Sequence, residues 1–393
     1  MRVTGLTLTG LGQSEDGSRW PRVLPGEEID ADGRILSPSA DRVSAPCRHY
    51  KGCGGCSMQH ASDEFVAGWK TEVVTRALHA RGLPVEIETV STSPPQSRRR
   101  AKFSGRRTRK GAIVGLHGRS SDTITEVTDC QVITPGLKAV LPALERLTGL
   151  GASRKSELDL TVTDSDGGPD IAVSGGREVD QALLLDLTAL AQENGIARLS
   201  WNGETLLTMA DPDHVMGQAR VVPPPGAFLQ ATRDGEAALV AHVLKAMAGA
   251  SRVIDLFSGC GTFALPLAST AEVHAVEGQP AMLAALDRAW RMGTGLRRVT
   301  TEARDLFRNP LTPPELGADG VVIDPPRAGS EAQVAEVAAA GVPVVAMVSC
   351  NPVTFARDAA ALVAGGYQMG PATIIDQFRW SAHVELCATF TMR

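Results

Sequence analysis

The chain has 393 residues, of which 43% are hydrophobic and 21% are charged, and its formal net charge is −5. This acidic balance excludes a protein that binds a polyanion through its overall charge. The sequence has no apolar run of the roughly 20 residues that a membrane helix needs, and its N-terminus lacks the apolar core of a signal peptide. We therefore expect a cytoplasmic protein with no membrane partner. At roughly 100–200 residues per domain, the length predicts two or three domains.

Cysteines are concentrated in the first third of the chain, which holds four of the seven: Cys47, Cys53, Cys56 and Cys130. The first three form a C-x5-C-x2-C segment with glycines between the last pair. A long chain without a signal peptide uses such a segment for a metal more often than for disulfides. Zinc sites favour paired C-x2-C knuckles, whereas glycines that bring backbone N–H groups close to sulfur suit an iron–sulfur cluster. We predict a 4Fe–4S cluster; zinc and, for Cys130 above all, an unrelated thiol are the alternatives.

The middle of the chain has a helix pattern over 63–80, which begins after Ser62 and ends before Gly82 and Pro84. The stretch 97–111 then contains eight basic residues: Arg98, Arg99, Arg100, Lys102, Arg106, Arg107, Arg109 and Lys110. In an acidic protein, so dense a basic stretch is typical of phosphate contacts, although a solvated surface hairpin has the same composition. We predict that the stretch contacts nucleic acid from within a central α+β domain at 70–225.

From about residue 250, the chain alternates apolar strands with helices, which is typical of a doubly wound α/β domain. The predicted strands are 252–257, 272–277, three runs that end at Asp305, Asp324 and Cys350, and the runs 367–376 and 383–392. The last two are joined by a short polar segment, so we expect them to pair antiparallel. The predicted fold class is α/β, with a seven-stranded Rossmann-like domain over 226–393.

The first strand of this domain leads into a D-x-F-x-G-x-G turn that contains Gly259 and Gly261, where backbone can approach a ligand closely. Glu277 ends the next strand and can accept hydrogen bonds from both ribose hydroxyls, and Asp305 at the tip of the third can hold an adenine amino group. The third glycine of the dinucleotide fingerprint is missing. The pattern therefore favours S-adenosylmethionine over NAD.

Two later loops lie at the same ligand-binding edge of such a sheet. In the first, which runs from Asp324 to Gly329, two prolines stiffen the backbone. Asp324 can face a sulfonium or the substrate, and Arg327 can reach an oxygen anion. A rigid structural turn is the alternative. Adenine amino-methyltransferases have a similar D-P-P loop, but an aromatic residue follows it there. In the second loop, Cys350 ends a strand just before Asn351 and Pro352, which places a thiol where the strand opens.

Taken in order, the four cysteines and the motifs GAFLQ, DLFSGCGTF, VEG, DPPRAG, SCNP and HVE resemble the RNA uracil-5-methyltransferases, which are class I enzymes dependent on S-adenosylmethionine. The resemblance extends from about Cys47 to the C-terminus, and the combined motifs are highly specific. The transfer RNA branch of this family lacks the cluster. The cysteines therefore indicate the branch that carries an iron–sulfur cluster and acts on 23S ribosomal RNA.

The resemblance implies that Cys350 is the nucleophile that adds to uracil C6 and that Glu385 is the base that removes the C5 proton. It also implies contacts with S-adenosylmethionine or the target base for Gln230, Phe257, Thr262, Glu277, Asp305 and Asp324. The predicted substrate contacts are Arg327, Gln230, Arg100 and Lys102. Thr262 and Asp305 stand where the family often has asparagine, and both keep a polar side chain. A positive charge such as Arg327 is expected to lower the pKa of the Cys350 thiol.

Members of this family usually begin with a small β-barrel RNA-binding domain, the TRAM domain. Residues 1–45 keep its G-x-G and LPGE landmarks but are too short for all its strands, so we predict a truncated TRAM-like β segment. The predicted parts are then this segment, a cluster segment at 46–69, an RNA-binding domain at 70–225 and a methyltransferase domain at 226–393. We expect a monomer.

Three other functions remain open. The RNA could be a transfer RNA. A cytosine-5 methyltransferase needs the same thiol attack, but usually has a second cysteine where this chain has DPPR. A non-catalytic, redox-sensing RNA-binding protein would keep the fold, but it gives no reason for the presence of both Cys350 and Glu385.

Overall fold

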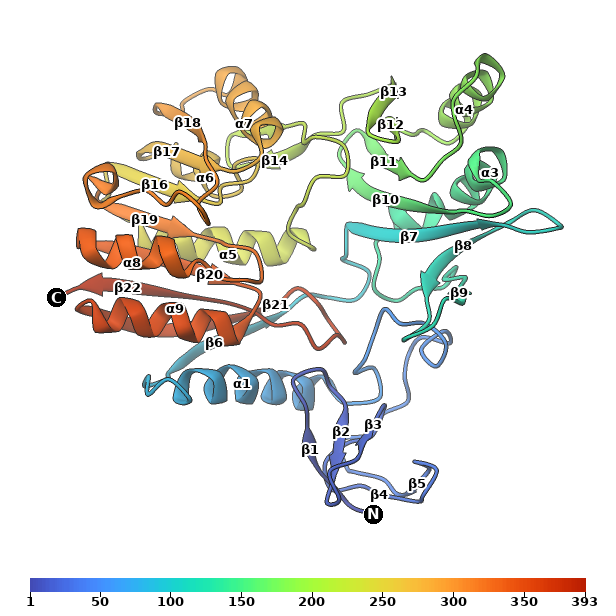
Figure 1. Cartoon of the computed structure of the whole chain (residues 1–393), viewed down its shortest axis with the longest axis horizontal. Helices are drawn as coiled ribbons and strands as arrows, with labels where there is room; N and C mark the ends of the chain where they lie inside the picture. The colour runs from blue at the N-terminus through green and yellow to red at the C-terminus, as the bar shows by residue number, and fades with distance from the viewer. The chain divides into compact units, whose positions relative to one another are not determined.

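The computed structural model describes all residues from Met1 to Arg393 (Figure 1) and divides the chain into two compact units. The first unit contains Met1–Lys70, Pro94–Ala210 and Phe378–His383. The second contains Thr71–Ser93, Asp211–Gln377 and Val384–Arg393. The predicted helix is present as α1 (Asp63–His79), whose first turns belong to the first unit and whose last turns belong to the second. No helix is long and apolar enough to span a membrane.

The second unit is built on an eight-stranded sheet in the order β18-β17-β16-β19-β20-β22-β21-β6. Its strands are β16 (Arg252–Leu256), β17 (Glu272–Glu277), β18 (Val299–Ala303), β19 (Gly320–Ile323), β20 (Val344–Ser349), β21 (Tyr367–Asp376), β22 (Glu385–Met392) and β6 (Ile87–Thr92). The seven predicted strands are all present, and β21 and β22 pair antiparallel as expected. The eighth strand, β6, pairs parallel with β21. The sequence did not reveal it, because this edge position depends on a partner that is very distant along the chain.

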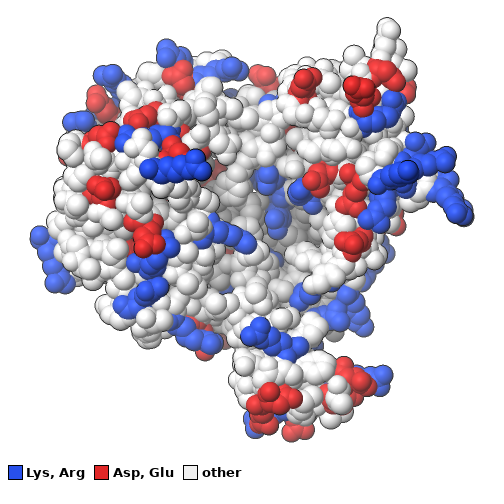
Figure 2. Space-filling model, viewed as in Figure 1, with Lys and Arg blue, Asp and Glu red and all other residues white.

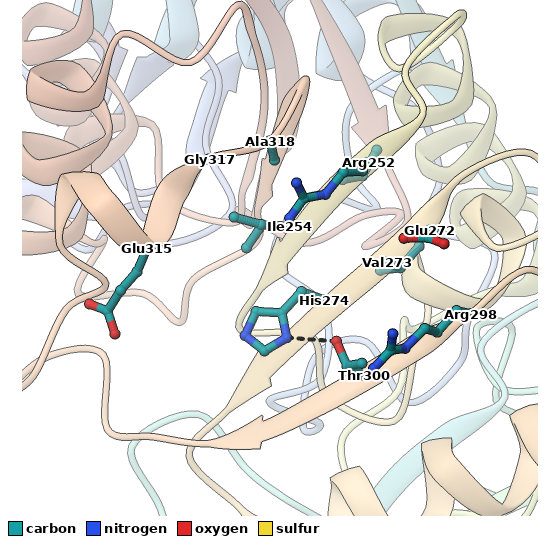
Figure 3. Close-up of a pocket in the computed structure, with 11 residues that line it drawn as sticks. Arg252, Ile254, Glu272, Val273, His274, Arg298, Thr300, Glu315, Gly317 and Ala318 are labelled. Atoms are coloured by element: carbon teal, nitrogen blue, oxygen red, sulfur yellow. Dashed lines mark hydrogen bonds between the residues drawn. The ribbon is translucent and has the colours of Figure 1, made fainter.

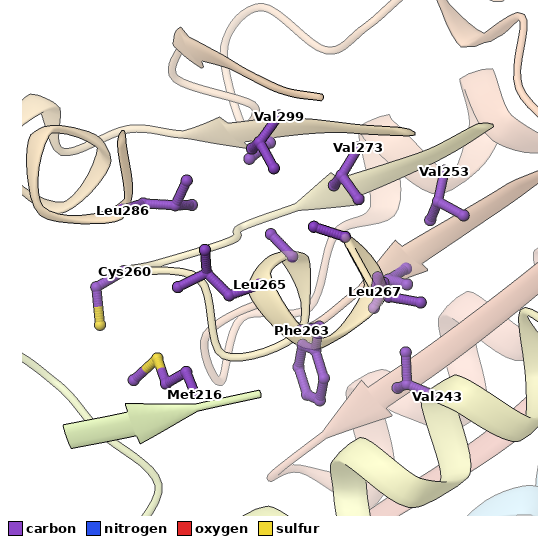
Figure 4. Close-up of a cluster of buried hydrophobic side chains, with 14 of the residues drawn as sticks. Met216, Val243, Val253, Cys260, Phe263, Leu265, Leu267, Val273, Leu286 and Val299 are labelled. Atoms are coloured by element: carbon purple, nitrogen blue, oxygen red, sulfur yellow. The ribbon is translucent and has the colours of Figure 1, made fainter. Parts of the chain in front are cut away.

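Helices cover both faces of this sheet, as the alternation of side chains along the strands requires. They are α5 (Arg233–Ala246), α6 (Ala264–Leu267), α7 (Pro280–Met292), α8 (Glu331–Ala340) and α9 (Pro352–Ala364), with a short 3-10 helix η1 (Pro313–Leu316). One core joins α5, α6 and α7 to the sheet; in Figure 4, Val253, Val273 and Val299 project from adjacent strands towards Leu265 and Leu267. On the other face, Phe355 of α9 packs on Phe390 of β22. The strand ends are therefore held between two layers of helices.

A small antiparallel hairpin completes the second unit. It consists of β14 (His214–Met216) and β15 (Ala219–Val221), and its buried residues belong to the same core as α5 and α7. The segment after it leads to the N-terminus of α5, where the Thr232 side chain accepts a hydrogen bond from the Gly235 N–H. This cap fixes the short segment that contains Gln230.

The first unit contains a seven-stranded sheet in the order β13-β12-β11-β10-β7-β8-β9. Its strands are β7 (Arg100–Arg107), β8 (Ala112–His117), β9 (Ile124–Thr125), β10 (Glu157–Ser165), β11 (Gly168–Ser174), β12 (Arg198–Trp201) and β13 (Glu204–Thr208). Its helices are α2 (Pro135–Ala139), α3 (Leu141–Gly151) and α4 (Gln181–Glu193). All pairs are antiparallel except β11 with β12. The buried residues of α3 and α4 share one core with this sheet, as expected for an α+β arrangement.

The N-terminal segment forms five very short strands. They are β1 (Val3–Leu6), β2 (Gly12–Ser14), β3 (Arg19–Trp20), β4 (Glu28–Ile29) and β5 (Ile35–Ser37). They make a three-stranded and a two-stranded antiparallel sheet, joined by a bridge between Arg2 and Glu28. The small core contains Val3, Val23 and Ile29. These five short strands lie within residues 1–45, for which a truncated TRAM-like β segment is predicted.

Candidate functional site

The turn after β20 holds Cys350 in a partly exposed position, whereas Cys260 and Cys387 are buried. Asn351 caps α9, because its side-chain Oδ1 accepts a hydrogen bond from the Val353 N–H at 3.1 Å. The side-chain amide of the same residue donates to the backbone carbonyl of Arg327 at 2.9 Å. The two loops singled out in the sequence are therefore tied together, and Asn351 links them.

The thiol of Cys350 lies within electrostatic reach of two carboxyl groups and one guanidinium. Burial, and then the charges of Glu385 and Asp324, raise its pKa to about 11, while Arg327 acts in the opposite direction. Arg327 favours the thiolate, which is the direction expected from the sequence. Its effect is outweighed by burial and by the two carboxyl groups, so the net shift is upward.

Glu385 is the first residue of β22, and its side chain is only 3% exposed. Burial, and then the charge of Asp324, raise the pKa of Glu385 to about 8. Burial also raises the pKa of Asp324 to about 7, against a hydrogen bond from Gln230. Two neighbouring carboxyl groups repel each other when both are ionised, so the pair tends to share one proton. At neutral pH the site can therefore both hold a proton and accept one.

The glycine turn after β16 has the conformation that close approach of a ligand requires. Phe257 and Gly259 have positive φ angles of 60° and 54°, and the φ of Gly261 is 100°. A side chain on Gly261 would also meet Leu265 and Leu286 at 3.0 Å. The ring of Phe257 lies 5.4 Å from that of Phe307, an exposed aromatic residue that sequence reasoning did not select. Thr262 is half-buried in the same turn.

Acidic side chains end the neighbouring strands at this edge. Glu277 accepts hydrogen bonds from the N–H of Gly259 at 3.1 Å and of Gln279 at 2.9 Å, so its two oxygens are held in place beside the turn. Each oxygen keeps a lone pair for a ribose hydroxyl. Asp305 follows β18, is exposed, and accepts from the N–H of Phe307 at 3.0 Å. The placement of both acids fits a bound nucleoside.

Sequence reasoning gave no role to the carboxyl group of Asp255, the first residue of the D-x-F-x-G-x-G motif. Asp255 is fully buried in β16, and neither of its side-chain oxygens has a hydrogen-bond partner. Burial, and then the charge of Asp324, raise its pKa well above the usual range. An orphaned buried carboxyl at the end of the central strand fits a site whose positively charged ligand completes it, which is what the sulfonium and amino groups of S-adenosylmethionine supply.

Gln377 is a second residue that the sequence did not reveal. It follows β21, is 2% exposed, and donates hydrogen bonds to the side chains of Gln230 at 2.7 Å and Glu385 at 2.9 Å. Gln230 in turn donates to Asp324 at 3.2 Å. The only signal in the sequence is a polar residue at the end of an apolar strand, which is common and carries no role of its own.

The four cysteines of the predicted cluster all belong to the first unit. Cys130 is buried in its core and Cys53 packs against that core. Burial, and then the charges of the other three thiols, raise the pKa of Cys56 to about 12, against a hydrogen bond with Gln59 that lowers it. The cysteines are thus near one another, but no group of three or more His, Cys, Asp or Glu side chains is arranged closely enough to hold a metal ion. The 4Fe–4S cluster is not confirmed and remains a prediction.

Backbone N–H groups near these cysteines donate to sulfur, as expected from the glycines in the sequence. The N–H of Gly55 donates to the Cys53 sulfur at 3.3 Å, and the N–H of Val132 donates to the Cys130 sulfur at 3.4 Å. A side chain on Gly54 would meet the backbone oxygen of His117 at 2.7 Å, so only glycine allows this contact. The thiols and their N–H donors suit an iron–sulfur cluster chemically.

The basic stretch is a hairpin formed by β7 and β8, and Figure 2 shows Lys and Arg side chains gathered at its tip. The exposed basic residues there are Arg106, Arg107, Arg109 and Lys110. Two of the four predicted substrate contacts lie in this hairpin: Lys102 pairs with Asp159 at 2.9 Å, and Arg100 is partly buried, with its pKa lowered by burial. The exposed basic side chains without a close acidic partner, such as Arg107, Arg109 and Lys110, therefore lie nearer the tip of the hairpin than Arg100 and Lys102 do.

The second unit also has a cavity of about 290 Å³ at the opposite ends of the strands (Figure 3). It is lined by residues at the starts of β16, β17 and β18, and in it His274 is hydrogen-bonded to Thr300 at 2.9 Å. None of the predicted site residues lines it. The chemistry-bearing residues converge instead at the carboxyl ends of the strands, which is where open α/β sheets bind ligands.

Comparison with known proteins agrees with this placement. The model of the tRNA (uracil-5-)-methyltransferase family matches residues 301–393. An uncharacterized RNA methyltransferase of Rhizobium meliloti is 43% identical, over 97% of this chain and 95% of its own. The 23S rRNA (uracil(1939)-C(5))-methyltransferase RlmD of Halomonas elongata is 34% identical, over 92% of this chain and 82% of its own.

One solved structure has the same fold over almost the whole chain. The tRNA (uracil-54, C5)-methyltransferase of Pyrococcus abyssi, solved in complex with S-adenosyl-L-homocysteine, superposes with a TM-score of 0.77. The comparison covers 99% of this chain and 98% of that one, at 20% sequence identity. At that identity, the likeness concerns the fold.

Proposed function

Because this chain belongs to the RNA uracil-5-methyltransferase family and is an S-adenosylmethionine-dependent enzyme, we propose that it methylates C5 of a uridine in 23S ribosomal RNA, with Cys350 as the nucleophile and Glu385 as the base. The observation that carries this proposal is that Cys350, Glu385, Asp324 and Arg327 come together at one sheet edge. Ser349 pairs with Leu386 in the adjacent strand, Asn351 donates to the Arg327 carbonyl, and two side-chain amides connect Glu385 to Asp324. A nucleophile, a base and a cation at one strand edge are what addition to uracil followed by proton removal needs.

The proposed reaction begins with addition of the Cys350 sulfur to uracil C6, which moves electrons onto C5 and O4. Arg327 lies near the thiol and can stabilise negative charge on the attacking sulfur or on the base oxygen. S-adenosylmethionine supplies the methyl group that C5 then takes. Glu385 removes the C5 proton, the C5–C6 double bond re-forms, and Cys350 leaves as a thiolate.

The state of the acids suits these proton transfers. The Cys350 thiol is protonated at neutral pH because its pKa is about 11, so it must lose a proton before it attacks. Asp324 and Glu385, with pKa values of about 7 and 8, are the neighbouring groups that can accept protons in the neutral range. A general base is most effective when its pKa lies near the working pH. The target uridine must be unstacked to reach a partly buried thiol.

The 23S substrate is supported by the Halomonas elongata relative and by the cysteine pattern of the resemblance. Transfer RNA is the second candidate, because the matching family model and the Pyrococcus abyssi enzyme are both named for it. We also propose that Cys47, Cys53, Cys56 and Cys130 hold a 4Fe–4S cluster that fastens residues 46–69 to the core beneath Cys130. The domain boundaries predicted from the sequence, after residues 45, 69 and 225, are part of the same proposal.

The test is anaerobic incubation of the purified protein with labelled S-adenosylmethionine and unmodified 23S ribosomal RNA or transfer RNA, followed by nucleoside analysis. We expect 5-methyluridine from ribosomal RNA, and none with Cys350→Ala. Product from transfer RNA alone would keep the mechanism and overturn the substrate. Methylcytosine, or no product from protein loaded with iron, would overturn the reaction itself.

A further inference from the structure

Gln377 makes three hydrogen bonds from one buried side chain, and all three partners belong to the site of the second unit. Its Oε1 accepts from the backbone N–H of Ala231 at 2.7 Å. Its Nε2 donates to Oε1 of Gln230 at 2.7 Å and to Oε2 of Glu385 at 2.9 Å. A side-chain amide has one acceptor oxygen and two donor hydrogens, and these three bonds use both hydrogens and the oxygen.

The direction of these bonds follows from a single backbone group. The Ala231 N–H can only donate, so the oxygen of Gln377 must face it, and the reverse orientation would set two donors against each other. The amide nitrogen then faces Gln230 and Glu385. Because Gln230 accepts at its oxygen, its own nitrogen is directed to Asp324. The Ala231 N–H thus sets the order of donors and acceptors along a chain of hydrogen bonds. This chain has the carboxyl group of Glu385 at one end and that of Asp324 at the other.

Gln377 is closely packed on the side that faces α5. Gly235, in the first turn of α5, faces it, and a Cβ on that glycine would lie 2.7 Å from the Cβ of Gln377. Thr232 caps the same turn and also bonds to Ser93 at 2.8 Å, so the segment that carries the Ala231 N–H is itself fixed. A buried amide whose two hydrogens and oxygen are all hydrogen-bonded, and whose neighbouring segment is capped, is a rigid support.

We propose that Gln377 is a positioning residue that holds the Glu385 carboxylate and the Gln230 amide in one fixed arrangement for removal of the C5 proton. This inference rests on the proposed function, since it assigns a support to its base. The hydrogen bond occupies Oε2 of Glu385 and leaves Oε1 to take the proton. It also favours the ionised carboxylate, because an N–H donor lowers the pKa that burial raises.

The step that depends on Gln377 can be separated from the steps before it. Addition forms the bond between the Cys350 sulfur and C6, and methyl transfer fills C5. Only afterwards does Glu385 take the C5 proton, so that the electrons of the C–H bond restore the C5–C6 double bond and break the bond to sulfur. A misplaced base therefore slows release while the methylated RNA is still attached to Cys350.

The experiment compares Gln377→Met with Gln368→Met, a matched change at an exposed position of the same strand. We expect kcat to fall about 10- to 100-fold in Gln377→Met, the loss typical of a small misplacement of a catalytic group. The KM for S-adenosylmethionine should change less than about threefold, and an RNA–protein adduct that survives denaturing electrophoresis should accumulate. Gln368→Met should behave as the wild type does.

The pH profile gives a readout that a purely structural role would not move. Loss of the N–H donor raises the pKa of Glu385, so the rise of kcat with pH should shift to higher pH in Gln377→Met. The groups that face Glu385 and remain in the variant are Asp324, Arg327, Cys350 and Cys387. The isosteric Gln377→Glu keeps the acceptor for Ala231. When ionised it has no donor and adds a negative charge beside Glu385, so it should shift the profile further in the same direction, and it serves if the methionine variant does not fold.

Three outcomes would contradict the inference. The first is a kcat for both Gln377 variants within about twofold of the control. The second is loss of turnover with neither adduct nor shift of the pH profile, which would mean that Gln377 only stabilises the fold. The third is a wild-type protein that makes no 5-methyluridine; this removes the proposed function, and it is distinguished because the control variant is then inactive as well.

Discussion

The two units differ in the charged side chains that they bury. In the second unit, the buried groups are acids such as Asp255 and Glu385, with Asp324 beside them. In the first unit they include bases, since Lys70 and Arg99 are almost completely buried. Burial of a charge costs several kcal/mol unless a partner compensates it. The two units therefore need different kinds of partner for their buried charges.

The acids of the second unit are compensated by side-chain amides and by protons. Gln377 and Gln230 donate to Glu385 and Asp324, and the pKa of both carboxyls is raised because burial favours the neutral form. Such groups change their charge near neutral pH. The unit is therefore equipped to move protons, which suits a site that must remove one from C5.

The bases of the first unit have several kinds of partner. Arg198 forms a buried ion pair with Asp170 at 2.7 Å, and other bases lie beside backbone carbonyls, an aromatic ring and thiols. Lys70 donates to the carbonyl of Phe378 at 3.4 Å, and Arg98 lies over the Phe378 ring with its guanidinium 5.8 Å from the ring centre. Burial lowers the pKa of Arg98, while Cys56 and Cys130 act in the opposite direction. This unit holds positive charge close to sulfur, which suits anionic thiolates or a cluster.

The largest expected effect tests the acidic side of this comparison. Glu385→Gln keeps an acceptor for Gln377 but cannot take the C5 proton, so we expect 5-methyluridine formation to fall about 10²- to 10⁴-fold, the usual contribution of a general base. The methylated RNA should remain bound to Cys350 as a covalent adduct in this variant. Single-turnover assays followed by denaturing electrophoresis measure both effects. Turnover above a tenth of the wild-type rate would contradict the assignment of the base.

The next effect tests the thiols of the first unit. Cys56→Ser should abolish iron binding and lower the thermal midpoint, because a cluster ligand contributes folding free energy. Cys387→Ala, which removes a buried thiol outside the cluster segment, is the matched control and should keep its iron. The measurements are iron content and a thermal melt of anaerobically purified protein. A Cys56→Ser variant that keeps a full complement of iron would defeat the cluster proposal.

A third effect concerns the pH dependence of stability. Glu385 has a pKa of about 8 in the folded protein and about 4.5 when unfolded, so the folded state holds the proton more tightly. Its stabilising contribution is complete below about pH 4.5 and is lost as the pH rises through about 8, with a slope of at most about 1.4 kcal/mol per pH unit. Glu385→Gln cannot titrate. Urea denaturation of both proteins between pH 6 and 9 should therefore show a weaker loss of stability in the variant, and parallel curves would contradict the raised pKa.

The smallest effect on stability is expected at the basic hairpin. Replacement of Arg107, Arg109 and Lys110 by serine should weaken RNA binding and reduce its dependence on salt by about 0.7 in slope for each phosphate that the hairpin no longer neutralises. The thermal midpoint should stay nearly constant, because all three residues are exposed. Arg288, Arg297 and Arg298, three exposed arginines of the second unit, provide a control of equal charge. Equal salt slopes in the two variants would show that the hairpin has no special role.

Much of the second unit could be predicted because its signals are local. Each of its apolar runs is followed by a turn with Gly, Pro or an acid, so β17 and β21 were predicted with the bounds that the structure shows. The ends of parallel strands meet at one sheet edge, which is why Cys350 and Asp324 could be placed together from sequence alone. The fold of the first unit was harder to predict from the sequence. Its seven-stranded sheet is mostly antiparallel, and its short strands show only weak alternation of apolar and polar residues.

By itself, the sequence determined the α/β class, the strand that ends in Cys350, the glycine turn and the family, because each depends on residues close together in the chain. The tertiary structure decided what long-range packing controls: the edge strand β6, the orphaned carboxyl of Asp255 and the high pKa of Cys350. It also decided the role of Gln377, whose three partners lie at positions 230, 231 and 385. Burial and hydrogen bonding depend on what surrounds a side chain in the folded protein, and neighbours along the chain supply only a small part of that environment.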